Sequence, residues 1–178
     1  MSPLTLDAEA LYAELLAAVR AMVQSSSAQA PAQAQPQTSL VGILSGGAWQ
    51  AERLQRDLKL PGEPGLLSIT LHRDDFNSRG MPAQSRQTKL PFEIEGRHIV
   101  LIDDVLHTGR TIRAAVNELY DFGRPASVQL AVLVDRAGRE LPVCAAHAAA
   151  RISLPREQRL SLERDAAGRL SFQIEGKS

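Results

Sequence analysis

The stretch Val100–Thr111, which reads V-L-I-D-D-V-L-H-T-G-R-T, decides the fold of this chain. Its first three residues are apolar without alternation, which is typical of a strand buried on both faces of a parallel sheet. Asp103 and Asp104 follow at the carboxyl end of this strand. Because ligands of open α/β sheets bind outside the carboxyl ends of the strands, the stretch predicts an α/β fold with a binding site here.

The residues that follow the acidic pair predict a phosphate-binding turn. Thr108–Thr111 combine hydroxyl groups, a glycine and backbone N–H groups at the point where the next helix is expected to begin. A helix N-terminus carries roughly +0.5 elementary charge and attracts phosphate. We therefore expect a phosphate and a polyol to be bound together at this strand end. The alternative is a strand end at which the two aspartates only cap the following helix.

The same string resembles the 5-phosphoribosyl-1-diphosphate (PRPP) signature of type I phosphoribosyltransferases. The resemblance implies that Asp103 and Asp104 are the catalytic residues and bind the ribose hydroxyls, directly or through a hydrated Mg²⁺ for which they are the candidate ligands. It also implies that the 5′-phosphate binds to the backbone and hydroxyls of His107–Thr111. The candidate nucleotide-binding run comprises Asp103, Asp104, Val105, Leu106, His107, Thr108, Gly109, Arg110 and Thr111.

Three further segments narrow the resemblance. Leu71–Phe76, Asp121–Ser127 and Val132–Pro142 look like the corresponding parts of bifunctional pyrimidine operon regulators and uracil phosphoribosyltransferases, and the match runs, with gaps, from about Leu40 to Leu154. It implies a type I phosphoribosyltransferase fold, in which a central parallel sheet is flanked by helices and carries a small hood. The implied reaction converts uracil and PRPP to UMP and diphosphate, with Mg²⁺ bound to PRPP.

A second buried strand is expected over Ser127–Val134, with its carboxyl end beside that of the Val100–Ile102 strand. This placement brings Asp135, Arg136 and Arg139 to the site as candidate base-binding residues. A uracil edge offers carbonyl acceptors and N–H donors, which an arginine and backbone groups can satisfy. The alternative for these three residues is a surface turn of mixed charge.

The pattern Ser45-Gly46-Gly47 lies between a predicted strand, Leu40–Leu44, and a predicted helix, Ala48–Lys59. Two glycines at such a turn allow the backbone to approach an anion closely. The resemblance identifies this turn as the loop that binds the diphosphate of PRPP, where many relatives carry basic residues. The basic residues are absent here, so the loop offers less charge to the diphosphate. Trp49, one turn into the helix, is expected in the core.

A second strand is expected over Gly65–His72, followed by the polar segment Arg73–Pro91. That segment is longer than an ordinary connection in a compact domain, and segments of this length are often functional. The resemblance implies a flexible lid over PRPP, and closing a loop excludes water from a reactive intermediate. Arg73, beside the strand end, and Arg86 are the candidate diphosphate ligands from this segment, and a solvated surface charge is the alternative for Arg86.

The flanking regions complete the predicted single domain of residues 1–178. Apolar spacing predicts an N-terminal helix over Asp7–Gln24 and another helix over Thr111–Phe122. Ser25–Ser39 is uncharged and rich in Ser, Ala, Gln and Pro, which predicts a flexible insertion. The expected apolar stripe of the first helix comprises Leu11, Leu15, Ala18 and Met22. Short strands are expected over Arg151–Leu154, Leu160–Glu163 and Leu170–Ile174, the last two as a hairpin that forms the hood together with the N-terminal helix.

Composition favours a cytoplasmic protein. The chain has 178 residues, 44% of them hydrophobic, and its 20 basic residues balance its 20 acidic ones. The one cysteine, Cys144, cannot form an intrachain disulfide and is expected to be buried. We find no apolar run near the ~20 residues that span a bilayer and no leader pattern at the N-terminus. The four histidines show no metal-ligand spacing, and His107 is expected to pack or stack.

Two other functions remain open at this point. The chain could be a nucleotide-sensing RNA-binding regulator with little catalytic activity, since the resemblance implies that some relatives bind pyrimidine-operon leader RNA in response to UMP or UTP. Its 17 arginines and three lysines form no basic run, so any RNA site requires a patch that is gathered in a homo-oligomer. The chain could also be a phosphoribosyltransferase for another base, because the Val100–Thr111 string concerns only the ribose phosphate.

Overall fold

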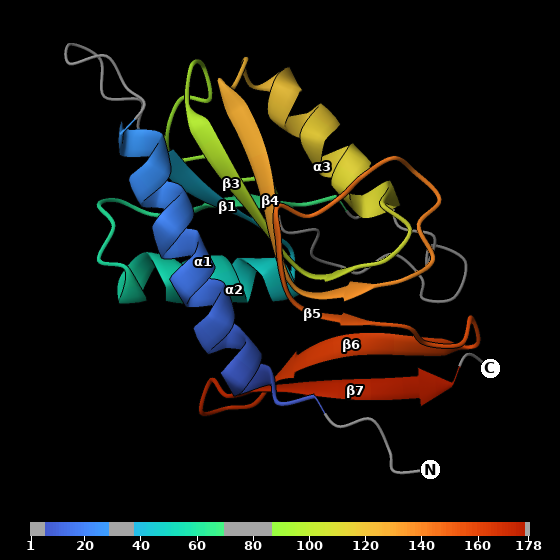
Figure 1. Cartoon of the computed structure of the whole chain (residues 1–178). Coiled ribbons are helices and arrows are strands. Elements are labelled where there is room, and N and C mark those ends of the chain that lie inside the picture. Colours follow the sequence, from blue (N-terminus) through green and yellow to red (C-terminus); the bar gives the residue numbers. More distant parts are fainter. Residues whose placement is uncertain (1–5, 29–37, 70–86, 177–178) are drawn as a thin grey trace.

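A computed structural model describes residues 6–28, 38–69 and 87–176 of the chain. Five parallel strands form the main sheet in the order β2-β1-β3-β4-β5, and β6 and β7 form a separate antiparallel pair (Figure 1). The elements in chain order are α1 Ala8–Ala28, β1 Thr38–Ile43, α2 Gly46–Asp57, β2 Gly65–Leu67, β3 His98–Leu106, α3 Arg110–Asp121, β4 Ser127–Arg136, β5 His147–Ile152, β6 Gln158–Arg164 and β7 Leu170–Gly176.

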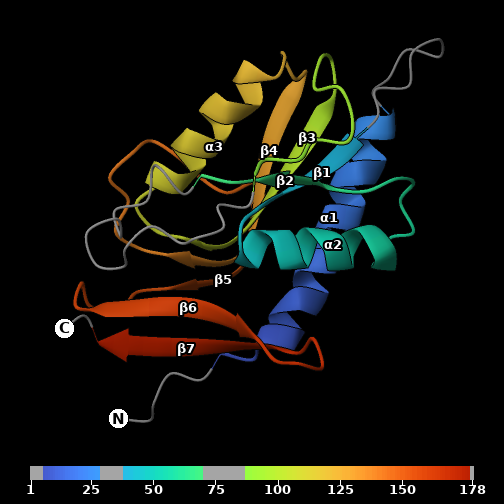
Figure 2. The ribbon, with the colours of Figure 1, turned by 180° about the vertical axis from the view of Figure 1, so that it is seen from behind.

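Helices cover both faces of the main sheet, as the apolar run in β3 predicts. Figures 1 and 2 show α1 and α2 on one side of the sheet and α3 on the other. Val100 and Ile102 belong to the apolar cluster beneath α1 and α2, whereas Ile99 and Leu101 belong to the cluster beneath α3. Because side chains alternate along a strand, a strand that is covered on both faces needs apolar residues at every position.

The N-terminal helix is longer than predicted, and its buried stripe is different. Asp7 caps it, since one carboxylate oxygen accepts hydrogen bonds from the N–H groups of Glu9 and Ala10. The predicted stripe is correct only in part: Leu15 is fully buried, whereas Leu11, Ala18 and Met22 are partly buried. The buried residues of α1 are Ala8, Tyr12, Leu15 and Val19. The helix continues to Ala28 and β1 begins at Thr38, so both ends of the predicted insertion are ordered, and residues 29–37 lie outside the described ranges.

Truncation of Leu15 tests this packing. Leu15 is fully buried between α1 and the sheet, so Leu15→Ala should lower the free energy of unfolding by about 2–5 kcal/mol. The matched variant Leu11→Ala should cost less, because Leu11 is only partly buried. Urea denaturation of both variants measures the difference, and equal losses would contradict the register of α1 described here.

The hood is the β6–β7 hairpin. Its strands pair over their full length, and the tight turn 165–169 joins them, with Gly168 at a φ of +83°. The strand predicted over Arg151–Leu154 differs from the prediction, because only its first two residues are in a strand. They form the end of β5, which pairs in parallel with β4 and belongs to the main sheet. The N-terminal helix also lies mainly on the sheet, against β4 and β5, and it contacts the hood at β7.

The strand predicted over Gly65–His72 is shorter in the structure. β2 ends at Leu67, and residues 70–72 lie outside the described ranges. Most of the predicted lid, including Arg73, also lies outside them. After the gap, Lys89 pairs with Leu66 through two backbone hydrogen bonds of 2.8 Å.

Cys144 is exposed, which corrects the expectation that it is buried. It lies in the irregular connection between β4 and β5. Among the helices of the described ranges, none is long and apolar enough to cross a membrane.

Candidate active site

A cleft of about 830 Å³ lies at the carboxyl ends of β3 and β4, between the main sheet and the hood. The sequence predicts much of its lining, namely Ser45, Gly46, the whole run Asp103–Thr111, Arg136 and Arg139. Of the remaining predicted residues, Gly47 and Asp135 lie behind the lining, and Arg73 falls outside the described part of the chain.

The acidic pair lies within β3, since that strand continues to Leu106 instead of ending at Ile102. Asp103 is only 3% exposed, whereas Asp104 is half-buried. One oxygen of Asp103 accepts the N–H of Asp104 at 3.0 Å, and one oxygen of Asp104 accepts the N–H of Val105 at 2.9 Å. These backbone hydrogen bonds orient both carboxylates at the cleft wall.

The loop Ser45-Gly46-Gly47 packs against the acidic pair. A Cβ atom on Gly46 would lie 2.4 Å from Oδ2 of Asp104, and a Cβ atom on Gly47 would lie 2.3 Å from the carbonyl oxygen of Ile102. Both distances are shorter than any real contact, so the loop can approach β3 only because these residues are glycines. Gly46 therefore lies at the cleft and beside Asp104, whereas Gly47 has a packing role.

The turn His107–Thr111 leads directly into α3. Gly109 is the N-cap of the helix, with a φ of +93°, and no side chain caps the helix there. Thr108 Oγ1 lies 3.3 Å from the N–H of Arg110, which is a weak hydrogen bond at most. The first turn of an α-helix has N–H groups without intrahelical partners. The positive N-terminal end of α3 therefore faces the cleft, as a site that binds an anion requires.

Two of the candidate base-binding residues brace this turn. Arg139 donates hydrogen bonds to the carbonyl oxygen of His107 and to the carboxylate of Asp135. The N–H groups of Glu140 and Leu141 both donate to the carbonyl oxygen of Thr108, at 3.0 and 3.1 Å. Asp135 thus holds Arg139, and Arg139 holds the turn.

Arg136 is a buried cation in the cleft wall. Its side chain is 3% exposed, and one Nη donates to the carbonyl oxygen of Pro155 at 2.9 Å. Its buried Nε has no hydrogen-bond partner within the described residues. Burial lowers the pKa of this guanidinium, although an arginine stays charged in proteins. A buried N–H group without a partner destabilises the folded protein, so we expect this group to bind an acceptor on a ligand.

The family model of the phosphoribosyl transferase domain matches residues 7–147, which include α1, the whole main sheet up to the start of β5 and every predicted site residue. The chain belongs to the phosphoribosyltransferase family. Within this family it is 47% identical to a protein of Ralstonia nicotianae named bifunctional protein PyrR, over 100% of this chain and 99% of that one. A protein of the same name from Pseudomonas aeruginosa is 51% identical over 68% of this chain and 72% of its own length.

Solved phosphoribosyltransferase structures share the fold. The HGPRT-ase of Leishmania tarentolae, solved with GMP, has a TM-score of 0.61 at 19% identity and covers 86% of this chain and 84% of its own. A hypoxanthine phosphoribosyltransferase of Trypanosoma cruzi has a TM-score of 0.57 at 22% identity, with 84% and 81% covered. These likenesses confirm the type I fold that the sequence predicts.

The phosphoribosyltransferase cleft includes residues that sequence reasoning missed. Trp49 packs partly against the core, as expected, but it also lines the cleft, with the guanidinium of Arg164 4.9 Å from its ring centroid. The hood forms the side of the cleft opposite the main sheet, and no local pattern in the sequence indicates that the residues of the hood line a cleft. The missed lining residues include Trp49, Glu140, Ser153, Leu154, Arg156, Arg159 and Ser161.

The donor set at the acidic pair suits a metal that arrives with a substrate. Within the described residues, no group of three or more His, Cys, Asp or Glu side chains could hold a metal ion. Mg²⁺ is usually bound through one or two carboxylates, with substrate phosphates and water as its other ligands. Asp103 and Asp104 supply carboxylates of this kind at one strand end.

Proposed function

We propose that this phosphoribosyltransferase converts uracil and PRPP to UMP and diphosphate, and that uridine nucleotides in the same cleft regulate pyrimidine gene expression. One observation carries the proposal. The acidic pair and the N-terminus of α3, whose N-cap is Gly109, line a single cleft in a chain that is 47% identical, over its full length, to a bifunctional PyrR protein.

The turn His107–Thr111 and the acidic pair would bind the two ends of the ribose phosphate. The N–H groups at the start of α3 and the hydroxyls of Thr108 and Thr111 face the phosphate. Asp103 and Asp104 accept hydrogen bonds from the ribose hydroxyls. As diphosphate leaves, positive charge develops at C1 of the ribose, and preorganised carboxylates lower the free energy of that state.

The diphosphate would lie at Ser45 and Gly46, where the loop contains no basic side chain. Its positive potential comes from the N-terminus of α2, where no side chain forms a capping hydrogen bond. Mg²⁺, bound at Asp103 and Asp104 together with PRPP, would supply charge neutralisation of the leaving diphosphate. Arg73, which lies outside the described residues, is proposed as a side-chain ligand of the diphosphate.

The base would meet Arg136 at the end of β4. The Nε of this residue has no hydrogen-bond partner in the described part of the chain, and this supports the assignment, since a carbonyl oxygen of uracil satisfies a buried N–H group. Asp135 and Arg139 act on the base site through the turn that they brace. No side chain is proposed as a proton-transfer catalyst.

A panel of bases tests the base assignment. We expect product formation from uracil with PRPP and Mg²⁺, and a rate at least about a hundredfold lower with hypoxanthine or guanine, because a polar site rejects bases that leave its groups unpaired. Faster conversion of a purine would contradict the uracil assignment and favour a phosphoribosyltransferase for another base.

The proposed regulation is through pyrimidine-operon leader RNA, bound by a homo-oligomer. The chain has zero formal net charge, so affinity for RNA has to come from arginines that assembly gathers on one face. Binding should therefore weaken steeply as the salt concentration rises, and UMP should change the affinity if the two sites are coupled. Titration of leader RNA and an unrelated RNA, at two salt concentrations with and without UMP, measures both effects. Equal weak binding of both RNAs with no effect of UMP would exclude the regulatory role.

A further inference from the structure

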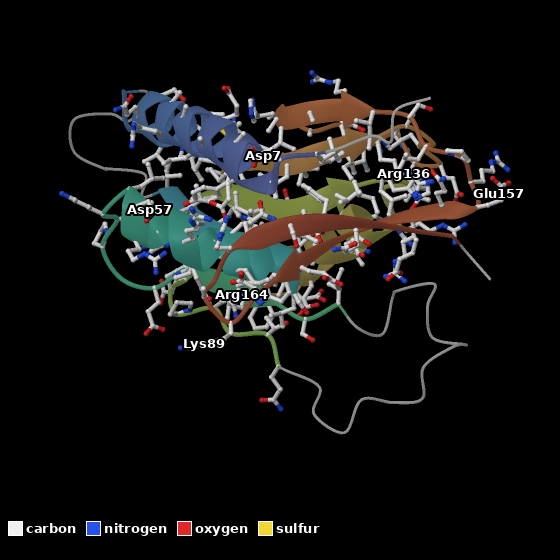
Figure 3. All side chains as sticks on the ribbon, turned by 90° about the horizontal axis from the view of Figure 1, so that it is seen from below. Asp7, Asp57, Lys89, Arg136, Glu157 and Arg164 are labelled. Carbon is white, nitrogen blue, oxygen red and sulfur yellow. The ribbon has the colours of Figure 1, made fainter. Side chains whose placement is uncertain are left out.

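The helix that begins at the loop Ser45-Gly46-Gly47 also contacts the hood. Trp49 lies one turn into α2 and lines the cleft, and its ring lies 4.9 Å from the guanidinium of Arg164, the last residue of β6. Figure 3 shows Arg164 over α2, at the end of the hood opposite to Arg136 and Glu157. This contact therefore joins the free end of the hood to the helix behind the diphosphate loop.

A second contact joins the same end of the hood to α1 and α2. Both carboxylate oxygens of Glu9 accept hydrogen bonds from Arg53 of α2, at 3.0 and 2.7 Å. The oxygen Oε1 of Glu9 also accepts the N–H of Leu170, the first residue of β7, at 2.9 Å. One carboxylate thus holds α1, α2 and the hood together, through the bidentate geometry that makes arginine–carboxylate pairs strong.

The side chain of Arg53 is itself fixed by its neighbours. Its guanidinium lies 3.8 Å from the ring centroid of Tyr12, a buried residue of α1. The hydroxyl of Tyr12 donates to the carboxylate of Asp57 at 2.8 Å. Burial, with the adjacent carboxylate of Asp57, raises the pKa of Tyr12 far above its ordinary value, so this hydroxyl keeps its proton. The ring of Tyr12 therefore helps to hold Arg53 in the orientation in which it donates to Glu9.

These polar contacts flank the turn 165–169 on both sides. The hood also buries Leu160, Leu162 and Leu170 in the cluster beneath α1 and α2. Apolar burial is nondirectional, so it attaches the hood without fixing its exact place. Directional contacts on each side of the turn fix that place relative to α2. In Figure 1 the turn lies beside the N-terminal end of α1, where Glu9 is located.

We propose that Glu9 and Arg164 are positioning residues that hold the hood over the base site. The proposal rests on the proposed function, because the hood covers the part of the cleft where uracil would lie. Neither residue lines the cleft. They act through the hood, so their loss should weaken binding of a ligand that carries a base and spare a ligand that has only the ribose phosphate.

The test compares UMP with ribose 5-phosphate, each titrated by calorimetry into the full chain. Glu9→Ala and Arg164→Ala should each lower the affinity for UMP by about tenfold, because the first removes hydrogen bonds to a charged group and the second removes a cation–π contact. Their affinity for ribose 5-phosphate should stay within about twofold of the starting protein, because the acidic pair and the turn His107–Thr111 are untouched. Glu9→Gln keeps an oxygen that accepts the N–H of Leu170 and should retain most of the affinity for UMP.

Glu14→Ala is the matched control. Glu14 is an exposed carboxylate on the same helix, and its removal should change neither affinity. If Glu9→Ala and Arg164→Ala weaken both ligands equally, or weaken neither, the positioning role is wrong. The role is also wrong if the starting protein binds UMP no more tightly than ribose 5-phosphate. The rate of UMP formation by the starting protein reports separately on the proposed function.

Discussion

Replacing Asp103 and Asp104 together with asparagine should lower the rate of UMP formation by at least about a thousandfold, because in the proposed reaction the carboxylates face the positive charge that develops on the ribose. The fold should persist. Each asparagine keeps an oxygen that can accept the backbone N–H now bound by the aspartate, Asp104 N–H or Val105 N–H. Initial rates at saturating uracil and PRPP, with a melting curve of the same sample, measure both effects.

The matched control is Asp121→Asn, which removes a carboxylate from an exposed position at the end of α3. Its rate should stay close to that of the starting protein. A double variant that keeps full activity would show that the acidic pair only caps the strand end. A double variant that unfolds would show that the buried carboxylate of Asp103 is needed for the fold.

Alanine at the two loop glycines should separate activity from stability. Gly46→Ala brings a Cβ to 2.4 Å from Oδ2 and 2.9 Å from Cβ of Asp104, which are side-chain atoms. We expect it to displace that carboxylate and lower the rate of UMP formation by about a hundredfold, with a smaller loss of stability than Gly47→Ala. Gly47→Ala brings a Cβ against the carbonyl oxygen of Ile102, which is backbone and cannot yield. We expect it to lower the free energy of unfolding by about 1–3 kcal/mol.

Gly176→Ala serves as the control for both variants, since a Cβ there meets nothing within 4 Å. Steady-state rates and urea denaturation distinguish the two effects. The described packing of the loop against β3 is wrong if Gly46→Ala keeps both its rate and its stability. The same conclusion follows if Gly47→Ala is as stable as Gly176→Ala.

The central part of the fold is predictable because its signals are local. The run Val100–Ile102 has no alternation, which indicates cover on both faces, and the structure confirms it. The acidic pair and the turn His107–Thr111 adjoin that run in the sequence, so their common cleft follows from the strand direction alone. The parallel neighbour β4 places Asp135 opposite Leu106 for the same reason.

The remainder of the site depends on contacts between distant segments. Glu9 accepts the N–H of Leu170, which lies 161 residues further along the chain, and no pattern around either residue indicates that they meet. The stripe of α1 was predicted only in part, because Leu11 and Leu15 share one broad apolar face with Tyr12, and only packing on the sheet decides which of these residues is fully buried. The bracing role of Arg139 likewise depends on the carbonyl oxygen of His107, which lies on another strand connection.

Conversion of radiolabelled uracil is the most direct test that this cleft transfers a phosphoribosyl group to that base. The purified chain is incubated with uracil, PRPP and Mg²⁺, and labelled UMP is separated from uracil, with the Asp103→Asn/Asp104→Asn variant as the matched blank. We expect UMP to accumulate in proportion to the protein, to require both PRPP and Mg²⁺, and to fall to the background level in the variant. No UMP above that of the variant would contradict the proposed reaction.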